Sequence, residues 1–165
     1  MLPKTPKCMF LIGVILLAGC SRKLGGDTEL YGPYAEEAQH CMDLVAKYDE
    51  KKPRHLSSDD IQKMEDLQAT NNPVSGDANG VLAVYANQDP KLKQDLIARS
   101  PVLESSQDAV VQASGVMIAY WYKLKDQEPK IHAIRQGLKA KSHLTFYEQL
   151  LLDNINQYYE RTGLK

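Results

Sequence analysis

The spacing of apolar positions along the chain predicts a succession of short helices. From residue 34 onward, apolar residues recur every three or four positions, which is the period of an amphipathic helix. The first such stripe ends at the Lys-Lys-Pro sequence 51–53. A second helix is expected to begin at Ser57 or Ser58 and to stop before the Asn-Asn-Pro sequence 71–73. The first stripe consists of Tyr34, Ala38, Cys41, Met42, Val45 and Tyr48.

The longest apolar segment, 109–122, is expected to form a central helix. It holds 14 positions without a charge, between Asp108 and Lys123. A helix that is apolar on all sides is buried in a protein core or in a membrane. Fourteen residues are too few to cross a bilayer, which takes about 20, so the core is expected. Gly115 and Ala119, four positions apart, would let a neighbouring helix approach closely.

The remaining apolar stripes predict further helices. The short run 81–87 fits a helix or a strand, and its alanines favour a helix. Asp89-Pro90 has the form of a helix start, and we expect that helix to break at Ser100-Pro101. The last two helices are expected to begin at Pro129 and Ser142, and the final one to end at Gly163. The inner face of the final helix is expected to comprise Leu144, Tyr147, Leu151, Ile155 and Tyr158, with Leu150 beside it.

Together these patterns predict the fold class. We expect an all-α protein: a compact bundle of six or seven short helices around the central apolar helix, about 107–124. No fixed repeat is present. The helical domain is expected to cover 34–165, and the glycine-containing stretch 20–33 reads as a flexible tether before it. Those residues could span at most about 45 Å when extended.

The start of the chain has the pattern of an export signal. Lys4 and Lys7 precede the apolar run 8–17, and small residues follow it. The sequence Leu17-Ala18-Gly19-Cys20 resembles the lipobox of a bacterial lipoprotein signal peptide. A buried N-terminal helix or an uncleaved anchor is the alternative.

The lipobox resemblance implies a lipid anchor. Signal peptide 1–19 would be removed, with Leu17, Ala18 and Gly19 as the recognised positions. Cys20 would carry a diacylglyceryl group and an N-acyl chain such as palmitate, which together hold a protein stably on a bilayer. Ser21, in place of aspartate, resembles the outer-membrane sorting pattern, so we expect a periplasm-facing outer-membrane protein.

Charge and cysteine content narrow the function classes. The chain has 20 basic and 21 acidic residues, and loss of Lys4 and Lys7 would leave a net charge of −3, which argues against bulk nucleic-acid binding. Cys41 would be the one unmodified cysteine of the mature chain, so it has no intrachain partner. We expect it to be a buried apolar residue, and an intermolecular bridge or reactive thiol is the alternative.

Motifs that carry chemistry are weak in this sequence. Glu37-x-x-His40 occurs once, whereas carboxylate-bridged metal bundles use two such motifs. The segment 75–80 imitates half of a calcium loop but has Ala86 where the bidentate glutamate belongs. We therefore predict no catalytic residue, metal, cofactor or small-molecule substrate. An envelope hydrolase would have to depend on His40, His132 or His143.

Two features point to a binding surface. The consecutive aromatics Tyr120, Trp121 and Tyr122 would fan over about 200° of a helix, so at least one should reach an edge where it could anchor a partner. The charge is also asymmetric: 27–66 holds 11 acidic and 5 basic residues, and 123–143 holds 2 acidic and 6 basic residues. Core packing of the aromatics and mutual pairing of two charged faces are the alternatives.

The preferred functional hypothesis is a non-catalytic binding or assembly factor for another envelope protein, such as a pilotin-like secretion-system accessory. The alternative is an immunity or exclusion lipoprotein, or an inhibitor of a cell-wall enzyme. That alternative would use the acidic region 27–66 against a basic target.

Overall fold

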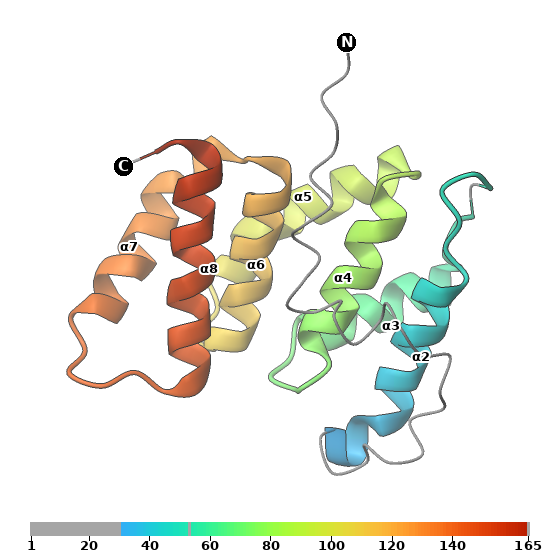
Figure 1. Ribbon diagram of the computed structural model, residues 1–165, viewed down its shortest axis with the longest axis horizontal. Helices are drawn as coiled ribbons and strands as arrows, with labels where there is room; N and C mark the ends of the chain where they lie inside the picture. The colour runs from blue at the N-terminus through green and yellow to red at the C-terminus, as the bar shows by residue number, and fades with distance from the viewer. Residues whose placement is uncertain (1–30, 53, 165) are drawn as a thin grey trace.

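The computed structural model describes residues 31–52 and 54–164, and this part of the chain is all-α, as predicted. It holds seven α-helices and two short 3-10 helices and no strand (Figure 1). The elements are η1 (Gly32–Tyr34), α2 (Ala35–Ala46), α3 (Ser58–Gln68), α4 (Ser75–Ala86), α5 (Pro90–Glu104), α6 (Ala109–Tyr122), η2 (Lys125–Gln127), α7 (Glu128–Lys139) and α8 (Phe146–Thr162). Tyr31 packs against the core and Gly32–Tyr34 form η1, so the part of the expected tether that the structure describes is packed on the helical domain.

Helix α6 lies between α8 and α5 (Figure 1), and residues on both of its sides are buried. Val111 and Ile118 join the core of α2–α5, which we call the N-terminal layer. Val116 and Ala119 join a second core made with α7 and α8, the C-terminal layer. The absence of charges over 109–122 is the property that allows one helix to face two cores at once. The expectation of a central helix is therefore confirmed.

The closest helix contact lies between α5 and α6 at Gly115. A Cβ added there would lie 2.8 Å from both the Glu104 nitrogen and the Ser100 carbonyl oxygen. The Ser100 hydroxyl also donates a hydrogen bond of 2.9 Å to the Gly115 carbonyl. Glycine is thus required for two backbones to meet, and the predicted close approach is confirmed at this position.

Helix α5 does not break at Ser100-Pro101, and this expectation was wrong. The helix continues to Glu104 with Pro101 inside it. Proline removes one hydrogen bond, but the last turn is held by α6 at Gly115 and by the Lys130 ammonium, which donates to the Pro101 carbonyl and the Ser105 hydroxyl. Tertiary contacts therefore outweigh the local preference.

Helix α8 begins later than expected, so the Ser142 cap was also wrong. Thr145 is the N-cap, and a complete capping box joins it to Glu148. Three other expected boundaries are present: Ser57 and Asp89 cap α3 and α5, and Gly163 ends α8 in the left-handed conformation. The first helix, α2, ends at Ala46, before the expected Lys-Lys-Pro stop at 51–53. The ambiguous run 81–87 lies almost entirely in α4.

Replacing Gly115 with alanine should destabilise the protein by about 1–3 kcal/mol or more, because the new methyl group meets backbone that cannot move aside. Gly137→Ala is the matched control, since nothing lies within 4 Å of its added Cβ, and should stabilise α7 by up to about 1 kcal/mol. Urea unfolding measures both changes. Equal effects of the two substitutions would contradict the close α5–α6 contact.

Candidate interaction surfaces

The aromatic residues at the end of α6 are mainly packing residues. Tyr120 is 3% exposed, and the Arg161 guanidinium lies 4.6 Å from its ring centroid. Trp121 is half-buried and packs against both cores. Tyr122 is also half-buried, with the Lys93 ammonium 5.2 Å from its ring centroid, and desolvation raises the pKa of its hydroxyl to about 12. Partner binding by Trp121 or Tyr122 stays a prediction, whereas Tyr120 offers no open ring face.

The exposed large apolar side chains of α8 lie at its start. Phe146, Tyr147 and Leu150 are 77%, 44% and 37% exposed. Leu150 lies four positions after Phe146 and three after Tyr147, so both aromatic residues are its neighbours on the helix surface, and the rings of Phe146 and Tyr147 form an edge-to-face pair at 5.4 Å. With the preceding turn 139–145, these residues form what we call the turn surface.

The sequence analysis placed Tyr147 on the inner face and Leu150 beside it, and the structure corrects this. Leu151, Ile155 and Tyr158 are buried as expected, whereas Tyr147, on the same stripe, lies in the first turn after the Thr145 cap and is exposed. The Thr-x-x-Glu pattern of 145–148 is a recognised helix-start signature and could have located the start correctly. No other pattern in the sequence indicates that Phe146 is exposed.

The turn surface also includes basic groups. Lys139, Lys141 and His143 are exposed. Lys141 forms a salt bridge with Glu148, and this contact together with the Thr145 hydrogen bonds lowers the pKa of the Glu148 carboxyl to about 2. The acidic residue of this region is therefore held in a cap and an ion pair, while Lys139 has no ion-pair partner among the described residues.

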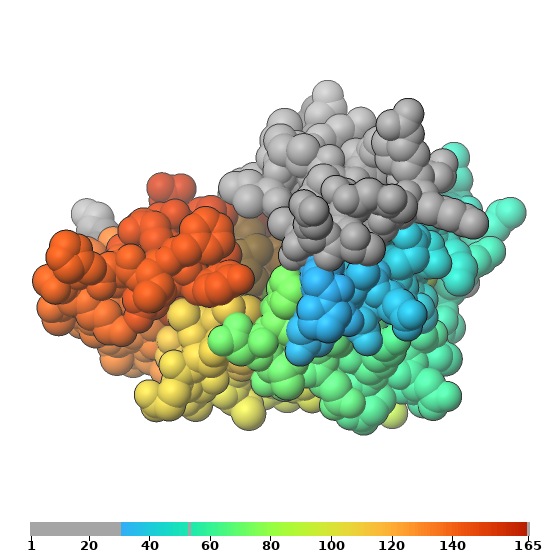
Figure 2. Space-filling view, turned by 90° about the horizontal axis from the view of Figure 1, so that it is seen from below, coloured from blue at the N-terminus to red at the C-terminus, as the bar shows by residue number. Residues whose placement is uncertain are grey.

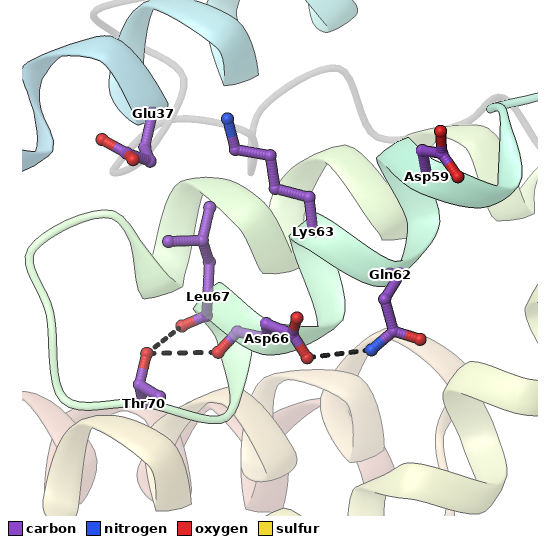
Figure 3. Close-up of a pocket in the computed structure, with 7 residues that line it drawn as sticks. All are labelled: Glu37, Asp59, Gln62, Lys63, Asp66, Leu67 and Thr70. Carbon is purple, nitrogen blue, oxygen red and sulfur yellow. Dashed lines mark hydrogen bonds between the residues drawn. The ribbon is translucent and has the colours of Figure 1, made fainter.

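A second candidate surface is an open groove between α2 and α3 (Figure 3). Its volume is about 520 Å³. One wall is Glu37 of α2, and the Lys63 side chain extends from α3 toward it (Figure 3). The Gln62 amide donates to Asp66 at 2.9 Å, and the Thr70 hydroxyl donates to the Asp66 and Leu67 carbonyls. The lining residues are Glu37, Asp59, Gln62, Lys63, Asp66, Leu67 and Thr70.

The groove lies in an acidic layer of the molecule. Residues 31–104 carry 13 acidic and 8 basic side chains, a net charge of −5 with neutral histidines. Asp60 is engaged by Ser57 and by His40 at 2.8 Å, contacts that lower the pKa of its carboxyl, and Glu65 pairs with Arg99 at 3.1 Å. The exposed Asp59 and Asp66 therefore remain as the α3 carboxylates that face solvent at the groove. The Glu37 Oε2 atom is buried and accepts no hydrogen bond.

A buried polar junction joins α5, α6 and η2. The Ser100 hydroxyl has one proton but lies near three acceptors: Glu104 Oε1 at 3.2 Å, the Gly115 carbonyl at 2.9 Å and Gln127 Oε1 at 2.7 Å. A protonated Glu104 can donate to Ser100 and so removes one of the three competing acceptors. Glu104 is 1% exposed, and desolvation raises its pKa to about 7. The pKa of Asp77 is raised for the same reason. Burial raises it to about 6, and a hydrogen bond from Tyr31 opposes this shift.

The remaining candidate residues from the sequence have no role in a joint chemical site or lie outside the described residues. Cys41 is 2% exposed, its thiol contacts the Met64 sulfur at 3.5 Å, and burial raises its pKa to about 12, so it is the expected buried residue. Glu37 and His40 do not form a joint site, because the His40 ring pairs with Asp60. The calcium-like segment 75–80 lies in α4 and has helical conformation. Leu17, Ala18, Gly19 and the lipid-attachment candidate Cys20 lie outside the described residues.

The raised pKa values of Glu104 and Asp77 predict that stability falls as pH rises. Between about pH 5 and 8 the folded chain holds protons that the unfolded chain has released, so the free energy of unfolding declines across this window. Glu104→Gln should remove up to about 3 kcal/mol of that decline, mostly below about pH 7. Urea unfolding at stepped pH measures it, with Asp77→Asn as the companion variant. A wild-type stability that rises across this window would contradict the buried carboxyl junction.

Neither metal-ligand geometry nor a membrane-spanning helix is found in the described part of the chain. No three His, Cys, Asp or Glu residues there are placed to hold a metal ion, and none of its helices is long and apolar enough to cross a bilayer. Comparison of the chain with protein-family models, curated proteins and solved structures finds no match.

Proposed function

We propose that this chain is a lipoprotein held on the outer membrane through acyl chains on Cys20, with its helical domain in the periplasm. The sequence Leu17-Ala18-Gly19-Cys20 supports the anchor, and Ser21 supports the choice of membrane. In this proposal the domain is a non-catalytic binding or assembly factor for another envelope protein, for example a pilotin-like accessory of a secretion system.

The observation that carries the binding proposal is the acidic groove between α2 and α3. A basic segment of the partner fits it best. Lysine or arginine head groups would meet the carboxylates of Glu37, Asp59 and Asp66, and their aliphatic stems would cover Leu67. The net charge of −5 over 31–104 would attract such a segment from a distance.

The same groove favours a second candidate function. An immunity or exclusion lipoprotein, or an inhibitor of a cell-wall enzyme, would also present carboxylates to a basic target. The two functions differ in what happens to the partner. An assembly factor changes the location or abundance of its partner, whereas an inhibitor blocks the activity of its partner. Crosslinking in native membranes, followed by mass spectrometry and an assay of the captured protein, separates them.

Neutralising the groove should weaken capture of the partner. We expect Asp59→Asn with Asp66→Asn to reduce the amount crosslinked roughly tenfold at low salt, because each lost charge pair contributes up to about 1 kcal/mol. The reduction should shrink at high salt. The double variant Asp43→Asn, Asp95→Asn is the control, since both residues are exposed acidic groups of the same layer outside the groove. Equal losses in the two double variants would argue against the groove.

Replacing Cys20 with serine tests the anchor separately. The thiol that would receive the diacylglyceryl group is then missing, so we expect an unlipidated precursor that still carries residues 1–19. Intact-protein mass spectrometry of the membrane fraction measures this directly. If a mature, membrane-bound form persists unchanged in the Cys20→Ser variant, the lipobox interpretation is wrong.

A further inference from the structure

The turn surface combines exposed apolar groups with basic groups at one end of the C-terminal layer. Phe146, Tyr147 and Leu150 supply the apolar part, and Lys139 and Lys141 supply the charge. We propose that this surface rests on the anionic bilayer that holds the acyl chains of Cys20. This inference rests on the proposed lipid anchor, and it assigns the bilayer itself, rather than a protein, to the turn surface.

The chemistry of the turn surface matches a membrane interface. Aromatic rings concentrate at the level of lipid head groups, where Phe146 could enter the acyl boundary and the Tyr147 hydroxyl could stay among polar groups. Lys139, which has no ion-pair partner among the described residues, would be attracted to anionic lipid by about 1 kcal/mol, whereas the charge of Lys141 is balanced by Glu148. Glu148 does not oppose this attraction strongly, because its carboxylate is held by Lys141 and by the Thr145 cap.

The position of the anchor allows the contact. The α7–α8 connection and the start of α2 lie at the same lower end of the molecule in Figure 1. Both are visible in Figure 2, which looks onto that end. Ten residues lie between Cys20 and Tyr31, and the eleven steps along the chain can span at most about 40 Å. An anchored domain therefore has enough chain to bring the turn surface down to the bilayer.

Charge asymmetry would orient the domain on the membrane. The N-terminal layer, with a net charge of −5 over 31–104, is repelled by anionic lipid. The basic turn surface is attracted to the same lipid. Both effects therefore rotate the domain so that the turn surface faces the bilayer. The molecule would rest on the α7–α8 connection, tilted so that the acidic N-terminal layer lies away from the lipid.

The test uses the lipidated full chain in vesicles of phosphatidylethanolamine and phosphatidylglycerol. His143→Cys places a thiol in the turn surface for a dye whose emission rises in an apolar environment. Cys41 should not compete for the dye, because it is buried and its pKa is raised to about 12. Val102→Cys is the matched control. Val102 is 71% exposed, and the neighbouring Pro101 carbonyl contacts Lys130 in the first turn of α7, the opposite end of that helix from the turn surface.

We expect the emission of the dye at 143, and not at 102, to rise on vesicles. Adding Phe146→Ser and Tyr147→Ser should reduce the docked population roughly tenfold, and replacing phosphatidylglycerol with phosphatidylcholine should also reduce it. The inference is overturned if the protein sediments with vesicles while the dye at 143 stays in a water-like environment. It is equally overturned if a crosslinker at 147 captures an envelope protein instead of lipid. Loss of sedimentation, or a mass without acyl groups, would instead show that the anchor itself is wrong.

Discussion

The structure depends on the burial of α6 from two sides. Its uncharged surface cannot face water, so the chain must cover it with α4 and α5 on one side and with α7 and α8 on the other. Close contact on the first side requires a residue without a side chain, and Gly115 meets this need against the backbone of Ser100 and Glu104. The same contact encloses Glu104 and extends α5 past Pro101. Helix α6 thus links the acidic and the basic halves of the molecule.

Much of this architecture could be predicted from sequence because the signals were local. A 14-residue stretch without charge predicts its own burial, and the caps at Ser57, Asp89 and Gly163 are chemical signals that hold wherever the helix packs. The prediction for Pro101 was wrong because proline lowers helix stability locally, whereas the contacts that compensate come from α6 and α7.

The candidate surfaces were harder to predict than the fold. Tyr147 lies four positions before the buried Leu151, on the predicted stripe, yet it is in the first turn of α8 and is 44% exposed, so its spacing alone does not predict its burial. The groove depends on α2 and α3 lying apart near Glu37 and Asp66, and no spacing in the sequence specifies this distance. In contrast, Tyr120 is the most deeply buried residue of the aromatic triplet. It is buried because α8 covers it and brings Arg161 over its ring.

In the proposed function, the molecule uses two separate binding surfaces. A basic and aromatic turn surface would lie toward the bilayer, and an acidic groove would remain open to a basic partner. Hydrogen–deuterium exchange of the lipidated protein on its native membrane, compared with the detergent-released protein, tests this arrangement most directly. The account predicts slower exchange on the membrane in two segments, 139–150 and 58–70. Protection confined to the end of α6 around Trp121, with both segments unchanged, would contradict it.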